Sequence, residues 1–470
     1  MWNLEEFSGR AAARDEAGVC LTYDELSREN KRLAAALNGR CLVFVLCSNT
    51  LGSLVGYTSC IQNKAVPLLL SKDLDSELLG HLLSVYKPKY LWLPVEMRFV
   101  YRTYRQVYEA FDYALLRTAY EEEYPLADEL CLLLTTSGST GSPKLVRQSY
   151  QNVLSNARAI VEYLELNQTE RPITTLPMNY TYGLSIINSH LLVGAEILFT
   201  EKGLMQKEFW DFFKEWGATS FGGVPYTYEM LDKLRFTRME LPSLRTMTQA
   251  GGKLQLDLHR KFAAYAQEKG KRFYVMYGQA EATARMSYLP CQMALEKCGS
   301  MGIAIPGGVF SIIDEEGSPI RTPHTTGELV YEGPNVTLGY AECGEDLALG
   351  DERRGRLETG DMAEFDEDGY YFITGRKKRF LKIFGNRVNL DEIDRLVKGR
   401  FEGIDCASTG QDDALHLYIT DESLKETVQK FIAEKTGLHF TAFTVRTIPS
   451  IPRNDSGKVL YQILEHIGES

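Results

Sequence analysis

The sequence predicts an α/β protein with two successive series of βαβ units, a strand-rich segment after them, and a small α+β region at the end. Continuous apolar runs of strand length alternate with helix-length amphipathic stretches between 21 and 94, and again between 196 and 278. After about residue 300, shorter apolar runs are separated by DEEG and DEDG turns, which is typical of antiparallel strands. A chain of 470 residues is also too long for one core, so we expect several domains.

The first series begins with a helix over 21–39. Thr22 is its expected N-cap, Glu25 lies three residues later in the capping-box position, and Gly39 follows its end. Strands at 41–47, 66–70 and 90–94 alternate with helices at 51–65 and 75–89. Two buried strands that are connected in the chain through a helix usually run parallel in one sheet. This segment therefore predicts a mostly parallel sheet.

The second series contains strands at 196–200, 219–225 and 272–278 and a helix at 206–217. Short antiparallel strands follow at 309–314, 327–333 and 370–375. A basic cluster then opens the last region, with Arg376, Lys377, Lys378, Arg379, Lys382 and Arg387. This change from short apolar strands to a basic cluster predicts a domain boundary near 375–379. The cluster is either a solvated surface or a contact for phosphates or acidic helices.

Composition excludes several classes of protein. The net charge of −11 argues against a nucleic-acid partner, since a phosphate-binding surface needs a basic excess. Nine dispersed cysteines without a CxxC pair are typical of free thiols in a reducing compartment. The first 18 residues have no signal-peptide pattern, and no apolar run is long enough for a membrane span. We therefore predict a cytoplasmic protein without membrane insertion.

The most informative motif is a glycine- and hydroxyl-rich loop, TSGSTGSPK at 136–144, that follows an apolar strand. Glycines let the backbone approach a ligand, hydroxyl and N–H groups bind phosphate oxygens, and Lys144 supplies positive charge. The loop is not a Walker A sequence, which requires G-x-x-x-x-G-K-[ST]. A flexible surface linker is the alternative, but the abrupt apolar strand and the closing Pro-Lys argue against it.

A series of motifs in a fixed order resembles the adenylate-forming superfamily of acyl-CoA synthetases, peptide-synthetase adenylation domains and beetle luciferases. The resemblance covers about 20–462 and includes LTYDEL (21–26), TSGSTGSPK (136–144), LPMNYTYGL (176–184), QAGGKL (249–254), YGQAE (277–281), GELVYEGPNVTLGY (327–340), the run 358–394 and IPRNDSGKV (451–459). It implies a large N-terminal domain, 1–377, with two stacked βαβ-type sheet subdomains and a small distorted β-barrel. It also implies a mobile α+β domain, 378–470, with a hinge near Lys378.

The resemblance further implies an ATP-dependent ligase that joins a small carboxylic acid to AMP with release of pyrophosphate, then transfers the acyl group to a thiol. Negative charge builds up on the phosphates in such a reaction, and preorganised donors and cations stabilise it. The resemblance implies that Glu281 binds Mg²⁺. It implies that the phosphates are bound by Thr136, Ser137, Gly138, Ser139, Thr140, Gly141 and Lys144. It implies that the ribose is bound by Asp361 and Arg376, and that the adenine is bound by Gly251, Gly252, Tyr277, Gly278 and Gln279. Lys458 is the implied cation that the small domain delivers to the carboxylate and α-phosphate oxygens.

The thiol step is implied to use another face of the small domain, reached by rotation about Lys378. Gly385 matches the loop that then lines the thiol tunnel, where the backbone must pass close to pantetheine. CoA is the first expectation for the acceptor. The phosphopantetheine of an acyl carrier protein is the second.

Three positions depart from the superfamily pattern. Ala280 stands where a threonine is usual, which removes one hydroxyl near the α-phosphate. Tyr180 stands where many acyl-CoA synthetases have histidine, and an aromatic gate there still closes the acid pocket. Gly183 stands where amino-acid-activating members carry an aspartate that pairs with the substrate ammonium. A buried ammonium without a counter-charge is costly, so an acid without an α-amino group is expected.

Three alternative functions remain open at this point: an acyl or amino-acid ligase that loads a carrier protein, a luciferase-type monooxygenase, and an inactive nucleotide-binding scaffold. Gly183 argues against the amino-acid ligase, and no feature specifically favours the monooxygenase. Ala280 is the hint for the scaffold, while retention of Lys144, Glu281, Asp361 and Lys458 argues against it.

Overall fold

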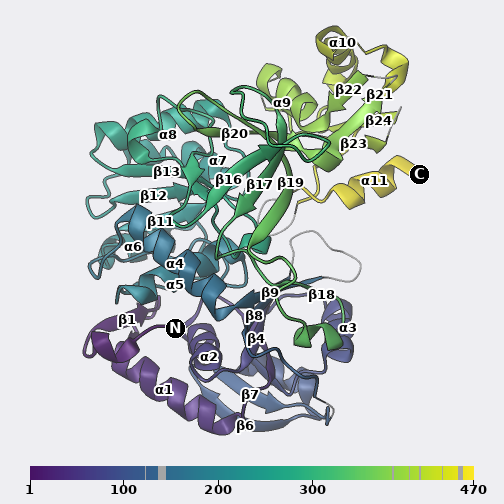
Figure 1. The fold of residues 1–470 in the computed structure, drawn as a ribbon. Helices are drawn as coiled ribbons and strands as arrows, with labels where there is room; N and C mark the ends of the chain where they lie inside the picture. The colour runs from purple at the N-terminus through teal and green to yellow at the C-terminus, as the bar shows by residue number, and fades with distance from the viewer. Residues whose placement is uncertain are drawn as a thin grey trace. The chain divides into compact units, whose positions relative to one another are not determined.

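The computed structural model describes residues 1–121, 123–135, 144–383, 386–401, 403–411, 414–436, 438–453 and 459–469. The chain divides into two compact units. Figure 1 labels the helices and strands of both. The first comprises 1–309 and 332–357, and the second comprises 310–331 and 358–470. Compactness does not locate a hinge, so the boundary expected after residue 377 stays a prediction.

An eight-stranded sheet in the first unit contains the first predicted series. Its order is β18 (Gly339–Ala341), β9 (Leu145–Ser149), β8 (Leu130–Thr135), β4 (Val66–Ser71), β3 (Leu42–Cys47), β5 (Tyr90–Pro94), β7 (Tyr113–Arg117) and β6 (Arg105–Ala110). The four strands β8, β4, β3 and β5 run parallel, as predicted, and the outer strands are antiparallel. The predicted parallel sheet is therefore confirmed at its centre.

Helices cover both faces of this sheet because successive residues of a strand point to opposite sides. Val43 and Val45 of β3 pack in one core cluster with α1 (Tyr23–Ala36) and α2 (Leu51–Gln62). Phe44 and Leu46 pack in another with α3 (Ser76–Tyr86). Burial on both faces explains why β3 reads as a continuous apolar run. Helix α1 begins with the predicted capping box, in which Thr22 and Glu25 bond each other's backbone N–H groups.

A second sheet in the same unit has the order β11 (Ser220–Gly223), β12 (Thr246–Gln249), β13 (Arg272–Tyr277), β14 (Ser287–Tyr288) and β15 (Ile303–Ala304). The first three strands are parallel. Its neighbouring helices are α4 (Tyr150–Leu164), α5 (Thr181–Leu192), α6 (Lys207–Glu215), α7 (Pro225–Lys233) and α8 (Leu256–Glu268). The sequence analysis missed β12, which is short and ends at the glycine pair.

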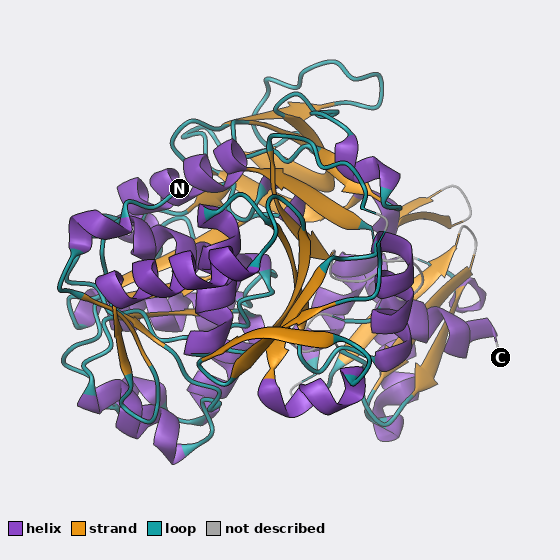
Figure 2. Ribbon diagram, turned by 90° about the horizontal axis from the view of Figure 1, so that it is seen from below, coloured by secondary structure: helices purple, strands orange, loops and turns teal. Residues whose placement is uncertain are grey.

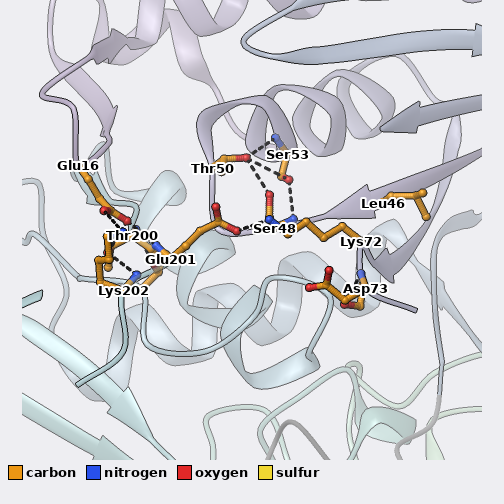
Figure 3. A network of polar contacts seen from close by, with 12 residues as sticks. Glu16, Leu46, Ser48, Thr50, Ser53, Lys72, Asp73, Thr200, Glu201 and Lys202 are labelled. Carbon is orange, nitrogen blue, oxygen red and sulfur yellow. Dashed lines mark hydrogen bonds and ion pairs between the residues drawn. The ribbon is translucent and has the colours of Figure 1, made fainter. Parts of the chain in front are cut away.

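The predicted strand at 196–200 is β10 (Ile197–Leu198), which lies outside the second sheet. It pairs with β1 (Ala11–Arg14), and β2 (Cys20–Thr22) completes a three-stranded sheet. Figure 3 shows the polar network around this region. Lys72, at the carboxyl end of β4, forms a 2.8 Å ion pair with Glu201, and Glu16 accepts a 2.8 Å hydrogen bond from Thr200 Oγ1. The Lys72–Glu201 pair joins the end of β4 in the eight-stranded sheet to the segment after β10 in the three-stranded one.

The second unit begins with an antiparallel region and continues into an α+β segment. Its first sheet has the order β16 (Val309–Ile313), β17 (Gly327–Glu332), β19 (Arg356–Phe365) and β20 (Tyr371–Arg376). The rest comprises β21 (Phe380–Ile383), β22 (Asn386–Asn389), α9 (Leu390–Arg400), β23 (Cys406–Gln411), β24 (Ala414–Ile419), α10 (Lys425–Thr436), β25 (Phe443–Thr447) and α11 (Tyr461–Glu469). Helices and strands alternate in this segment. Figure 2 draws the helices of the chain in purple and the strands in orange. Among the described residues, no helix has both the length and the apolar character needed to cross a bilayer.

Candidate active site

The glycine-rich loop connects two neighbouring strands of the eight-stranded sheet. Strands β8 and β9 are antiparallel, with Thr135 opposite Leu145. Thr136, Ser137, Gly138, Ser139, Thr140 and Gly141 lie outside the described residues, so their predicted roles stay predictions. Lys144 is described, and its Nζ lies 2.6 Å from Oε1 of Glu342. Both side chains are more than half exposed, and an exposed ion pair of this kind contributes only about 0–1 kcal/mol. The pair with Glu342 therefore holds Lys144 in place only weakly.

Glu281 is held from two sides at the carboxyl end of the second sheet. It lies in the short helix η4 (Ala280–Ala282) that follows β13. Its carboxylate Oε1 accepts a 2.7 Å hydrogen bond from the Tyr340 hydroxyl. Its backbone carbonyl accepts bonds from the Thr337 N–H at 3.0 Å and from Arg353 Nη1 at 3.2 Å. Glu281 is thus a positioned carboxylate.

Tyr340 is the functional residue that the sequence analysis missed. It ends the segment 327–340, which was matched as a motif without a role for its last residue. The Arg353 guanidinium lies 4.5 Å from the centre of its ring. Burial, with the Glu281 carboxylate adding to it, raises the pKa of Tyr340 to about 12, so the phenol stays protonated and donates. The sequence feature that could have identified Tyr340 is its position as the last residue of a glycine-containing motif.

The donor set around Glu281 fits a magnesium ion. Mg²⁺ binds one or two protein carboxylates and fills its remaining positions with phosphate oxygens and water. Tyr340 occupies one oxygen of Glu281, and no group among the described residues donates a hydrogen bond to the other, Oε2. Glu281 is the residue that would hold the ion, and the ion would supply positive charge beside the phosphates.

The acid-side and adenine-side motifs meet in the first unit. Gly251 has a φ of +83°, a conformation that favours glycine, and a Cβ there would lie 2.6 Å from the Tyr180 hydroxyl. Gly251 and Gly252 follow the carboxyl end of β12, while Tyr277 ends the parallel neighbour β13. Ligands of α/β sheets bind beyond the carboxyl ends of their strands. The structure therefore brings three predicted motifs to the edge where a ligand is expected.

Two further contacts order this edge. Thr181, next to Tyr180, donates a hydrogen bond from its hydroxyl to the Thr283 carbonyl, which ties the start of α5 to the segment after β13. Gln279 Nε2 donates to the Tyr277 hydroxyl at 3.1 Å. Burial raises the pKa of Tyr180 to about 12, so this side chain is neutral at physiological pH, and its role as a gate stays a prediction.

The two ribose residues predicted in the second unit are cross-strand neighbours. Asp361 on β19 pairs in register with Arg376 on β20, and Nε of Arg376 lies 3.6 Å from Oδ1 of Asp361. The Asp361 side chain is 9% exposed and the Arg376 side chain 62%. Their mutual placement is what a shared ligand needs. Lys378 lies in the turn Lys377–Arg379, and Gly385 and Lys458 lie outside the described residues.

The basic cluster has internal partners at two positions. Arg379 is buried, donates to Asp394 at 2.8 Å and to the Ser408 carbonyl at 2.9 Å, and pairs with Asp391. Lys377 pairs with Glu328 at 2.6 Å. Arg379 therefore stabilises the C-terminal core, so it is not a surface contact for phosphates.

A family model described as AMP-binding enzyme matches residues 2–341 of this chain. The chain therefore belongs to the AMP-binding enzyme family, within the adenylate-forming superfamily that its motifs predicted.

Among curated relatives, peroxisomal OPC-8:0-CoA ligase 1 of Arabidopsis thaliana is 29% identical over 360 residues, which cover 73% of this chain and 65% of that protein. The oxalate–CoA ligase of the same plant is 31% identical over 276 residues, or 57% and 52%. The 2-succinylbenzoate–CoA ligase of Bacillus velezensis is 23% identical over 469 residues, or 95% and 93%. The chain thus spans less than two thirds of the length of the first two relatives.

Solved structures share the fold. O-succinylbenzoate coenzyme A synthetase of Bacillus subtilis, in complex with AMP, superposes with a TM-score of 0.80 at 19% identity, covering 98% of this chain and 97% of that one. ATP-bound MatB from Rhodopseudomonas palustris superposes with a TM-score of 0.79 at 21% identity, covering 99% and 98%. The predicted fold class, with its large N-terminal and small C-terminal parts, is confirmed.

Proposed function

We propose that this protein is an AMP-forming acid–thiol ligase. In the first step a carboxylate oxygen of the acid attacks the α-phosphorus of ATP, and the bond to pyrophosphate breaks. In the second step a thiol sulfur attacks the acyl carbon, AMP leaves, and the thiol proton passes to solvent. The observation that carries the proposal is the Tyr340–Glu281 pair, a positioned carboxylate at the ligand-binding edge of a chain in the AMP-binding family.

The residues divide the work of the first step. Lys144 and the glycine-rich loop bind the leaving phosphates, and Glu281 positions the metal-binding oxygen. Asp361 accepts hydrogen bonds from the ribose hydroxyls, with Arg376 beside it. Lys458 brings a positive charge to the oxygens of the acid and the α-phosphate. Together these groups stabilise charge that is greater in the transition state than in the bound substrates.

The second step uses CoA in this proposal, and the relatives described above, which are named as CoA ligases, support that acceptor. Rotation about Lys378 brings Gly385 to the thiol tunnel. The phosphopantetheine of a carrier protein is the second candidate acceptor. All nine cysteines are free thiols, which supports a reducing compartment such as the cytoplasm.

ATP–pyrophosphate exchange over a panel of acids tests the first step, and mass detection of acyl-CoA tests the second. The panel contains aliphatic monoacids, aromatic acids, dicarboxylic acids and amino acids. We expect exchange with at least one acid lacking an α-amino group, and thioester formation when CoA is added. Absence of exchange with every acid, from a protein that still binds ATP, contradicts the proposal and favours a scaffold.

A further inference from the structure

A buried arginine lies against the core cluster that contains Tyr163 and Tyr182. Arg285 is 2% exposed. Its Nε donates to Ser185 Oγ at 3.1 Å, and its Nη1 donates to the Tyr163 hydroxyl at 2.9 Å. The guanidinium carbon lies 5.0 Å from the centre of the Tyr182 ring. All of these partners are neutral.

Arg285 lacks the counter-charge that the other buried arginines have. Three arginines among the described residues are buried. Arg147 pairs with Glu352, and Arg379 pairs with Asp391 and Asp394. Within the described part of the chain, Arg285 forms no ion pair, and its Nη2 donates no hydrogen bond. An unpaired buried cation costs several kcal/mol, so a fold that keeps one has a use for it.

The titratable groups near Arg285 supply no negative charge that would balance its guanidinium. His190 lies on α5, one to two turns beyond Ser185. Burial lowers the pKa of His190 to about 4, and the charge of Arg285 acts in the same direction. Tyr163 and Tyr182 have raised pKa values because they are buried, so neither supplies a negative charge. The positive charge of Arg285 is therefore uncompensated at neutral pH.

The contacts of Arg285 place it at the acid side of the site. Tyr163, Tyr182 and Met276, which it touches, belong to one apolar cluster with Ala250 and Tyr180. Tyr180 and the residue after Ala250, Gly251, form the close contact between the acid-side and adenine-side motifs. The guanidinium is thus linked to Tyr180 through the Tyr182 ring, whose centre lies 6.4 Å from that of the Tyr180 ring.

Gly183 prevents any carboxylate from entering at the start of α5. A Cβ at Gly183 would lie 2.3 Å from the Pro177 carbonyl oxygen, so the helix packs here only with glycine. Near the start of α5, Arg285 therefore supplies a cation and position 183 supplies no anion. An ammonium on the substrate is repelled, while an anion is attracted and takes the unused donors of Arg285 in a charge-assisted bond.

We propose that Arg285 is a specificity-determining residue that binds a second carboxylate, so that the substrate is a dicarboxylic acid of which one carboxylate is adenylated. This inference rests on the proposed ligase function. Arg285 does not touch the reacting atoms. It holds the far end of the acid and thereby sets which carboxylate reaches the α-phosphate.

The test compares dicarboxylic acids of increasing length with their monomethyl esters, which keep the shape and remove one charge. ATP–pyrophosphate exchange gives kcat and KM for each. We expect wild-type kcat/KM to favour one diacid over its half-ester by on the order of 100-fold, because a buried charge pair is lost. In Arg285→Gln, kcat/KM for the diacid falls by a similar factor, mainly through KM, and the half-ester changes by less than about 3-fold. Arg285→Lys recovers part of the preference.

Arg272→Gln is the matched control, because Arg272 lies at the opposite end of β13, where it pairs with Glu165. The Arg272→Gln variant should keep the wild-type preference for the diacid over its half-ester. A wild type that exchanges monoacids or half-esters as well as diacids overturns the inference and leaves the ligase function standing. Absence of exchange with all acids overturns the ligase function itself. Equal losses on diacid and half-ester in Arg285→Gln show a structural role and also overturn it. If Arg285→Gln does not fold, the wild-type comparison decides.

Discussion

The hydroxyl of Tyr340 donates a 2.7 Å hydrogen bond to the carboxylate of Glu281, linking two segments far apart in the chain. Tyr340 lies on β18, the edge strand of the eight-stranded sheet, and Glu281 follows β13 of the second sheet. The bond therefore fixes the proposed metal-binding carboxylate relative to both sheets of the first unit.

Tyr340→Phe should weaken adenylation by about 5- to 30-fold in kcat/KM. The variant keeps the ring but leaves Glu281 Oε1 without its donor, at a cost of about 1–2 kcal/mol. The Mg²⁺ concentration needed for half-maximal ATP–pyrophosphate exchange should rise, because the carboxylate is less well positioned. A magnesium titration of both proteins measures this.

Tyr108→Phe provides the matched control for that change. Tyr108 also donates a 2.7 Å hydrogen bond to a glutamate, Glu29, but it lies on β6, the other edge of the same sheet. Its exchange rate and magnesium dependence should equal those of the wild type. Equal effects of the two substitutions would show that Tyr340 acts only through stability.

Asp361→Asn should raise KM for ATP by about 10-fold or more. The change removes the charge that faces Arg376 at 3.6 Å and that, in the proposed function, receives hydrogen bonds from the ribose hydroxyls. Glu364→Gln, on the same strand, is the control and should leave KM unchanged. An unaltered KM in Asp361→Asn would remove this residue from the proposed nucleotide site.

Lys458→Ala should abolish formation of the acyl-adenylate, a loss of at least about 100-fold, because the cation at the α-phosphate is removed. Transfer from synthetic acyl-adenylate to CoA should be spared, since in the proposed function that step uses another face of the C-terminal domain. Single-turnover assays separate the two steps. Equal losses in both would contradict the proposed division of labour. Lys435→Ala, on α10, serves as the control.

Ala280→Thr should accelerate adenylation by about 5- to 100-fold, because it restores a hydroxyl that is worth roughly 1–3 kcal/mol when it bonds developing charge. Ala280 is half-buried at the start of η4. Ala280→Val, of the same shape without the hydroxyl, is the control. If valine and threonine have the same effect, the hydroxyl is not the missing group.

Stability should fall as the pH drops from 6.5 towards 4. Burial lowers the folded-state pKa of His190 to about 4 from an ordinary value of 6.5. Between pH 6.5 and 4 the unfolded chain therefore binds a proton at His190 that the folded chain does not bind. The contribution of His190 to the free energy of unfolding is fully present only above pH 6.5 and is lost as the pH falls towards 4. The slope is at most about 1.4 kcal/mol per pH unit for this residue.

Chemical denaturation of wild type and His190→Gln at pH 7.5, 6 and 5 measures that slope. The variant should lose less stability on acidification than the wild type, whatever its stability at pH 7.5. His81→Gln, at an exposed position on α3, should follow the wild-type profile. Identical profiles for His190→Gln and the wild type would show that His190 does not resist protonation.

Local patterns were sufficient where the determining contacts are local. The capping box of Thr22 and Glu25 joins residues three apart, and the apolar run of β3 reflects burial on both faces of one strand. The metal-binding role of Glu281, assigned from the five-residue motif YGQAE, stays a prediction. Strand β12 was missed because its four residues contain no long apolar run, and its pairing with β11 and β13 is what makes it a strand.

By itself, the sequence determined the α/β class, the order of the motifs and the family to which they belong, because these depend on residue types and on spacing along the chain. The tertiary structure decided which distant residues share a contact: Tyr340 with Glu281, Asp361 with Arg376, and Gly251 with Tyr180. It also decided that Arg285 is buried without a carboxylate. The physical reason is that a counter-charge is defined by distance in space, and that distance is fixed only when separate strands and helices pack together.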